Sequence, residues 1–208
     1  MLENYKKHNN GVIEQITKIK FNYNKDYINN SYNTYGELGM RMAHQRLGYL
    51  IGSLGFIPES LLDVGYGNGD FLKAASSIIP LTYGNDISTY PIPENSIFIN
   101  DPYNISVDVV TFFDVLEHFH DIYDIKLLNT KYILISVPNC HYFSDNWFDN
   151  WKHRRPEQHF WHFNEESLIN FMDEIGYDVI NTTNIEDTIR DNKMDYDNIL
   201  TGVFKKRV

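Results

Sequence analysis

Three glycines separated by single residues follow a short apolar run. They are Gly65, Gly67 and Gly69, and Asp63 lies two positions before the first of them. Glycine adopts positive φ readily and lacks a Cβ atom, so such a loop lets a ligand lie against the backbone. The N–H groups of a helix that follows can then face this ligand. The pattern is typical of a strand, a tight turn and a helix that together open a nucleotide-binding α/β sheet.

A second carboxylate lies where nucleotide-binding folds place a ribose ligand. Asp86 ends the predicted strand 81–86, and it follows Asp63 by roughly the 20 residues that such folds use. A carboxylate can accept hydrogen bonds from both ribose hydroxyls at once. The alternative is an aspartate that caps a turn or a helix. The distance along the chain favours the ribose role.

A third group of reactive side chains follows the apolar run 107–113. Glu117 and His118 come shortly after this run, and His159 lies beyond a later aromatic segment. Histidine suits a general base because its unperturbed pKa of about 6.5 leaves it neutral at cellular pH. In the alternative interpretation, His118 only packs the start of a helix and His159 only anchors a loop.

The same region contains a possible metal-binding group. Glu117, His118, His120 and Asp121 are all potential ligands. Neighbouring residues on one helix do not share a face, however, and no histidine pair has a recognised ligand spacing. The sequence therefore predicts no metal site.

Strands and helices alternate along most of the chain, which is typical of an α/β fold with a parallel sheet. A helix is expected over 37–54, where Ala43, Leu47 and Leu50 recur at helical spacing. The run 107–113 is almost continuously apolar, as expected for a buried parallel strand. Further strands are expected at 81–86, 96–100, 132–137, 179–183 and 199–204, and further helices at 71–77 and 168–175.

The motifs also resemble those of a known family. The pattern D-x-G-x-G-x-G, preceded by Leu61 and Leu62, resembles motif I of the class I S-adenosylmethionine-dependent methyltransferases. The segment D-V-V-T-F-F-D-V-L-E-H-F at 108–119 resembles the region after the fourth strand in small-molecule members. The resemblance covers roughly residues 35–205. It implies a Rossmann-like, seven-stranded, mostly parallel sheet with helices on both faces and an antiparallel last strand.

The resemblance implies S-adenosylmethionine as cofactor. An arginine on the helix before the glycine loop would hold the methionine carboxylate, with an exposed helix arginine as the alternative. An aspartate after the third strand would accept from the adenine amino group, and an Asp-Pro turn explains that residue nearly as well. The cofactor-binding residues carried over are Arg41, Asp63, Gly65, Gly67, Asp86, Asp101 and Phe113.

The expected function is methyl transfer to a small metabolite, a sugar or a lipid-linked acceptor, with oxygen as the acceptor atom. The catalytic candidates are His118, His159 and Glu117, in that order. One alternative is an inactive protein of the same fold that binds or regulates a partner. A dinucleotide-dependent oxidoreductase is disfavoured, because Asp70 stands where its third glycine belongs.

The sequence predicts two regions. Residues 1–36 form a polar segment with a short helix, on which Val12, Ile16 and Ile19 share a face. Residues 37–208 form the methyltransferase domain, with an aromatic-rich lid at 140–163. A small satellite core is the alternative for this lid.

Composition limits the partners. The net charge of −10 disfavours nucleic acid. A single cysteine, Cys140, cannot form an internal disulfide, which indicates a reducing compartment, and a cytoplasmic protein is expected. No apolar run reaches membrane-spanning length, so membrane insertion is not expected. Nothing in the sequence indicates an oligomeric state.

Overall fold

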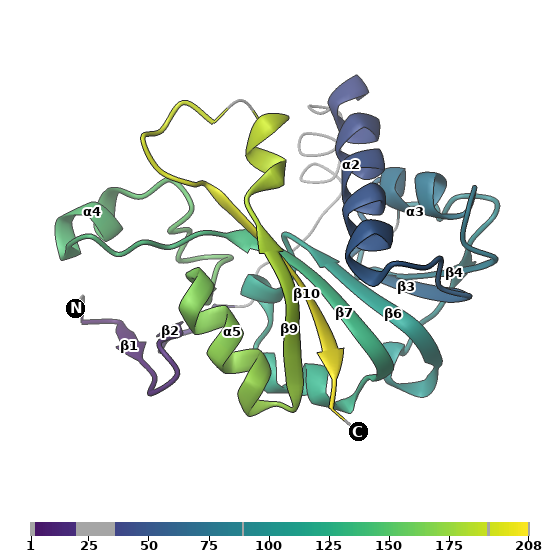
Figure 1. Ribbon diagram of the computed structural model, residues 1–208. Coiled ribbons are helices and arrows are strands. Elements are labelled where there is room, and N and C mark those ends of the chain that lie inside the picture. Colours follow the sequence, from purple (N-terminus) through teal and green to yellow (C-terminus); the bar gives the residue numbers. More distant parts are fainter. Residues whose placement is uncertain (1–2, 20–35, 89, 191, 208) are drawn as a thin grey trace.

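A seven-stranded sheet forms the centre of the molecule. The computed structural model describes residues 3–19, 36–88, 90–190 and 192–207. The strand order is β5-β4-β3-β6-β7-β10-β9, and β10 alone runs opposite to the other six strands (Figure 1). This confirms the predicted fold class. The strands are β3 (Ser60–Val64), β4 (Leu81–Asn85), β5 (Ile97–Phe98), β6 (Ser106–Phe113), β7 (Asn129–Pro138), β9 (Tyr177–Thr183) and β10 (Ile199–Lys206).

Helices cover both faces of this sheet, which explains why its central strands are apolar at consecutive positions. Leu61 packs with helices α2 (Gly36–Leu54) and α3 (Asp70–Ala75) on one face. The next residue, Leu62, packs with α5 (Glu165–Glu174) on the other face. Side chains alternate along a strand, so each such pair contributes to both cores.

The chain also forms shorter helical segments. Helix α4 (Asp145–Asn150) lies in the aromatic-rich segment. Among the described residues, no helix is long and apolar enough to span a membrane. The 3-10 helices are η1 (Pro102–Asn104), η2 (Leu116–His118), η3 (Ile122–Leu127) and η4 (Ile185–Thr188).

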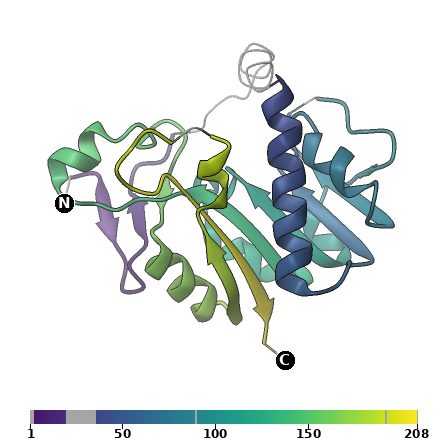
Figure 2. The same cartoon turned by 45° about the horizontal axis from the view of Figure 1, so that its top comes forward.

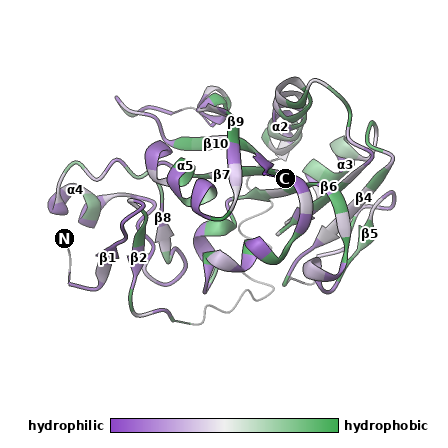
Figure 3. Cartoon of the chain, turned by 60° about the horizontal axis from the view of Figure 1, so that its bottom comes forward, coloured by the Kyte–Doolittle hydropathy of each residue, from purple (hydrophilic) through white to green (hydrophobic). Residues whose placement is uncertain are grey.

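The N-terminal segment forms a β-hairpin where the sequence predicts a helix. Strands β1 (Tyr5–Lys7) and β2 (Ile13–Gln15) are antiparallel, and β2 also pairs with β8 (Trp161–His162) (Figure 3). The helix prediction is wrong because Gly11, at φ 92°, turns the chain back after His8. Ile16 and Ile19 are therefore more than half exposed, and the tertiary contact with β8 overrides local spacing. Residues 20–35, the rest of this predicted polar segment up to Gly36, lie outside the described residues.

The aromatic-rich segment packs against this hairpin. Phe148 and Trp151 are buried with Cys140 in a third cluster that includes Tyr5 and Ile13. The hairpin lies beside α4 (Figure 2), and the Tyr5 and Phe148 rings meet edge to face with centroids 4.9 Å apart. The segment therefore forms the satellite core described above, and its closure over a ligand stays a prediction.

Candidate active site

The carboxyl ends of β3, β4 and β6 meet at one edge of the sheet. Val64, at the end of β3, pairs with Asn85 of β4 and with Phe112 of β6. Parallel neighbours must end side by side, so the glycine loop, Asp86 and the segment after β6 are brought together. Ligands of open α/β sheets bind at this edge.

The local geometry requires glycine at two positions of the loop. Gly65 has φ 74° and Gly67 has φ 57°, a region that other residues rarely adopt. A Cβ atom on Gly65 would lie 2.4 Å from Cγ2 of Val115. The loop therefore packs directly on the segment after β6, which places Glu117 and His118 in the same part of the molecule.

Asp86 helps to hold the loop in place. Its Oδ2 accepts from the Gly67 N–H at 2.8 Å, and its Oδ1 accepts from the Ser88 N–H at 2.6 Å. Each carboxylate oxygen has a second lone pair, so the side chain retains capacity for two further hydrogen bonds. The predicted ribose contact is compatible with this geometry and stays a prediction.

Asp63 and Asp101 are placed differently from each other. Asp63 is buried and accepts from the Thr111 hydroxyl at 2.7 Å. Burial raises its pKa to about 7 despite that hydrogen bond. Asp63 thus supports the strand beneath the loop. Asp101 is exposed and caps η1, where it accepts from the backbone N–H of Tyr103 and the side-chain amide of Asn104.

Arg46, rather than the predicted Arg41, contacts a residue at the end of β6. Arg41 is exposed on α2, whereas Arg46 is partly buried on the same helix. The guanidinium of Arg46 lies 4.1 Å from the ring centroid of Phe113, and the Phe71 ring packs on Phe113 at 4.6 Å. Phe113 is thereby fixed at the end of β6. A role for Arg41 in cofactor binding stays a prediction.

A buried group of charges joins three elements beside this edge. Glu186 of η4 is fully buried and binds Arg46 through two hydrogen bonds, of 2.7 and 3.0 Å. Arg190 binds both Glu186, at 2.9 Å, and Asp114, at 2.5 Å. Burial alone would raise the pKa of Glu186, but the charges of Arg46 and Arg190 lower it below its usual value.

The sequence does not predict this charge network, because residues 184–198 resemble an acidic loop. The spacing of Glu186 and Arg190 is i,i+4, which is typical of an ion pair on one helical turn. That spacing was the available signal. The partner Arg46 lies far away in sequence and only the fold brings it close.

The three catalytic candidates form one cluster. Ligand-type atoms of Glu117, His118 and His159 all lie within 4.8 Å of one another. The two imidazole rings are nearly perpendicular, with centroids 4.7 Å apart. Two hydrogen bonds fix the cluster: the Phe160 N–H donates to the Glu117 carbonyl at 2.7 Å, and Nδ1 of His118 donates to the Gln158 carbonyl at 2.9 Å. His159 comes from another segment, so the spacing of residues on one helix does not limit this cluster.

Burial disfavours the charged form of each of these three side chains. Burial, followed by the charge of Asp114, raises the pKa of Glu117 well above its usual value. Burial lowers the pKa of His118 to about 4. Burial and the neighbouring histidines lower the pKa of His159 to about 2. As isolated side chains the imidazoles are neutral but weak bases, which differs from the near-neutral pKa expected from the sequence.

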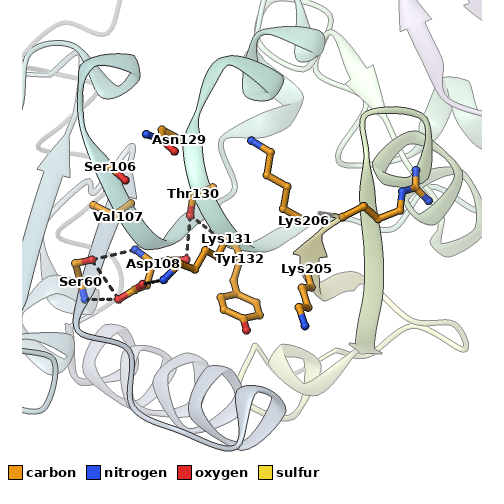
Figure 4. Close-up of a pocket in the computed structure, with 11 residues that line it drawn as sticks. Ser60, Ser106, Val107, Asp108, Asn129, Thr130, Lys131, Tyr132, Lys205 and Lys206 are labelled. Atoms are coloured by element: carbon orange, nitrogen blue, oxygen red, sulfur yellow. Dashed lines mark hydrogen bonds and ion pairs between the residues drawn. The ribbon is translucent and has the colours of Figure 1, made fainter.

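A separate pocket lies at the opposite edge of the sheet (Figure 4). Its volume is about 450 Å³, and its lining includes Ser60, Ser106 and Asn129, the first residues of β3, β6 and β7. The carboxyl ends of these parallel strands hold the glycine loop and the Glu117 cluster. The pocket is therefore not part of the candidate active site.

Comparison with known proteins places the chain in a family. The model of the family described as "Methyltransferase domain" matches residues 36–182. No curated protein matches the chain. Many solved structures share the fold.

Three of these structures show how much of the chain the similarity covers. Magnesium protoporphyrin IX methyltransferase from Synechocystis PCC 6803, with bound S-adenosylhomocysteine, is 14% identical over 89% of this chain and 96% of its own, with TM-score 0.61. 1,6-Didemethyltoxoflavin-N1-methyltransferase from Burkholderia thailandensis is 14% identical over 95% and 96%, with TM-score 0.60. An S-adenosylmethionine-dependent methyltransferase from Clostridium acetobutylicum ATCC 824 is 11% identical over 86% and 100%, with TM-score 0.60.

The chain belongs to the methyltransferase domain family. Its glycine loop and sheet order are those of the S-adenosylmethionine-dependent class. The predicted family, enzyme class and cofactor are thereby confirmed.

Proposed function

We propose that this methyltransferase acts on a small molecule and that the acceptor atom is a hydroxyl oxygen. The observation that carries the proposal is the buried cluster of Glu117, His118 and His159 beside the glycine loop. A hydroxyl is a poor nucleophile until its proton is removed, so an oxygen acceptor needs polar groups of this kind at the reacting edge. An amine needs less help, because its free base is already nucleophilic.

The residues around the cofactor would have different roles. S-adenosylmethionine supplies a methyl group on a positively charged sulfur. The backbone of Gly65 and Gly67 and the carboxylate of Asp86 would hold it, and Phe113 would form an apolar wall. The cluster side chains would orient the acceptor hydroxyl and favour the loss of its proton. Alignment and exclusion of water supply much of the acceleration in such a transfer.

The small-molecule assignment has two supports. Two similar structures carry the names of enzymes that act on magnesium protoporphyrin IX and on 1,6-didemethyltoxoflavin. The net charge of −10 also disfavours a phosphate-rich acceptor. The second of these enzymes is an N1-methyltransferase, so the choice of oxygen rests on the cluster alone.

Transfer of a radioactive methyl group tests this function. The purified chain would be incubated with methyl-labelled S-adenosylmethionine and a panel of phenols, sugars, carboxylic acids and amines. We expect label in a hydroxyl compound, with S-adenosylhomocysteine formed in equal amount. Label only in amines would contradict the oxygen assignment. Tight binding of S-adenosylhomocysteine without transfer to any acceptor would favour the regulatory alternative.

We predict that Asp86→Ala weakens the binding of S-adenosylhomocysteine without unfolding the domain. Loss of hydrogen bonds to a charged acceptor costs about 1.5–3 kcal/mol each, which corresponds to at least a tenfold rise in Kd. Calorimetry on both proteins measures the change, with the melting temperature as the check on folding. An unchanged Kd would leave Asp86 as a residue that only holds Gly67.

We also predict that the segment 140–163 becomes more ordered when ligands bind. It follows β7, so it borders the edge at which the cluster lies, and Phe143 at its exposed side is 63% accessible. Hydrogen exchange with and without S-adenosylhomocysteine and acceptor measures this. We expect slower exchange at 141–147 and little change at Phe148, which is already buried. Equal, unchanged protection throughout would contradict a lid.

A further inference from the structure

The Glu117 cluster presents a donor set that metal ions use. Two imidazole nitrogens and one carboxylate oxygen, from η2 and from the segment before β8, lie within 4.8 Å of one another. Two histidines and one glutamate are a known ligand set for catalytic zinc, which keeps a further position open for water or substrate. Magnesium and calcium prefer oxygen ligands alone, so the set favours a zinc-type ion.

The cluster also contains polar atoms that the described part of the chain leaves without a partner. Glu117 is 1% exposed and His159 is 5% exposed. Neither carboxylate oxygen of Glu117, nor Nδ1 of His159, has a hydrogen-bond partner among the described residues. A buried polar group without a partner is costly, and a carboxylate more so than most. A cation between these atoms would satisfy them.

The surrounding backbone orients the ligands as metal sites require. Nδ1 of His118 must be the donor to the Gln158 carbonyl, because a carbonyl only accepts. The ring also has a backbone hydrogen-bond partner at Asp114, and a backbone hydrogen bond that orients the ring is usual for histidine ligands. Zinc ligands lie at about 2.0–2.2 Å from the ion, so each side chain would move inward by about 1 Å or less.

From this geometry we propose that Glu117, His118 and His159 bind one divalent ion of zinc type, and that this ion binds the acceptor hydroxyl. The metal site stands on the donor set and the unpartnered atoms, while its part in methyl transfer rests on the proposed function. It revises the expectation, drawn from the sequence, that the chain has no metal site. An ion at this position would explain why the buried carboxylate of Glu117 lies beside the imidazoles of His118 and His159.

The ion would act as a Lewis acid in a reaction without redox change. One carboxylate and two neutral imidazoles leave a net positive charge on the site, which stabilises the deprotonated hydroxyl. The hydroxyl proton passes to water. An oxygen lone pair forms the new O–C bond, and the electron pair of the breaking C–S bond goes to sulfur. The products are the methylated acceptor and S-adenosylhomocysteine, and the ion is unchanged.

Metal binding can be measured without any acceptor. The full chain, stripped with EDTA and desalted, would be titrated with Zn²⁺ in competition with a coloured chelator. We expect one ion per chain, and Glu117→Gln and His159→Asn should each weaken Zn²⁺ binding by at least about 100-fold. His120→Ala, an exposed histidine two residues from His118, is the matched control and should bind as the wild type does. Unchanged affinity in both cluster variants would overturn the site, as would a wild type that binds no Zn²⁺.

The absorption spectrum of the wild type with Co²⁺ gives a second measurement, which holds even when a variant fails to fold. Ligands of nitrogen and oxygen give visible d–d bands without sulfur-to-metal charge transfer. A charge-transfer band would assign the ion to Cys140, the single cysteine, and contradict the proposal.

Calorimetry with S-adenosylhomocysteine on the same stripped protein separates the two conclusions. Binding of S-adenosylhomocysteine without Zn²⁺ binding would overturn the metal inference alone. Zn²⁺ binding to a protein that transfers methyl to amines only would overturn the proposed oxygen acceptor alone.

Discussion

Glu117→Gln is expected to slow methyl transfer by roughly 10²–10⁴-fold, the range that loss of a proton-removing group produces. The substitution keeps the shape of the side chain and removes the carboxyl group, which can lose a proton or bind an ion. Because burial already raises the pKa of Glu117 well above its usual value, a neutral glutamine fits the apo site with little change in stability. The Kd of S-adenosylhomocysteine should therefore stay close to that of the wild type.

Single-turnover kinetics with an acceptor found in the labelling panel measures this loss. His159→Asn should produce a loss of similar size, because both residues belong to one cluster, and the double variant should be little worse than either single one. His120→Ala should transfer methyl at the wild-type rate. A rate within tenfold of wild type in both cluster variants would mean that alignment alone drives the reaction.

Glu186→Gln is expected to lower the free energy of unfolding by about 3 kcal/mol, the lower end of the range for breaking a buried ion pair. Glu186 is fully buried and accepts from Arg46, Arg190 and the Ser136 hydroxyl. Glutamine would leave two arginines short of one negative charge. Asp114 still pairs with Arg190, which limits the loss.

Urea unfolding at several pH values checks this prediction. The pKa of Glu186 lies below its unfolded value of 4.5, so its contribution is complete above that pH and is lost as the pH falls through the native pKa. The difference between wild type and Glu186→Gln should therefore shrink below pH 4.5. Glu166→Gln, an exposed glutamate in the first turn of α5, should change stability by less than about 1 kcal/mol. A similar loss in both variants would contradict a special role for Glu186.

The strands and main helices could be predicted because their residues carry strong local signals. The run 107–113 is apolar on both faces, and it forms the buried β6. The antiparallel pair 179–183 and 199–204 was also expected, and β10 does run antiparallel to β9. The glycines at alternate positions predicted the loop. Gly65 adopts a positive φ, which few other residues allow.

What the sequence could not provide was contact between distant segments. The segment that forms the β1–β2 hairpin was expected to contain a helix. Its pairing with β8 is a long-range contact, which no local pattern in the sequence predicts. Glu117, His118 and His159 were predicted as catalytic candidates, but their close contact depends on hydrogen bonds between the segment after β6 and a loop some 40 residues later. Arg46 and Glu186 likewise come from opposite ends of the chain.

The hairpin at the start of the chain also affects how the protein folds during synthesis. Strands β1 and β2 leave the ribosome well before Trp161, to which β2 pairs through Glu14. Contacts so distant in sequence slow folding, because the intervening chain must be ordered before they form. Until then Val12 and Ile13 are exposed to solvent and other chains, and the loop that holds His159 lacks its support. We expect nascent chains released before residue 162 to aggregate or to require a chaperone.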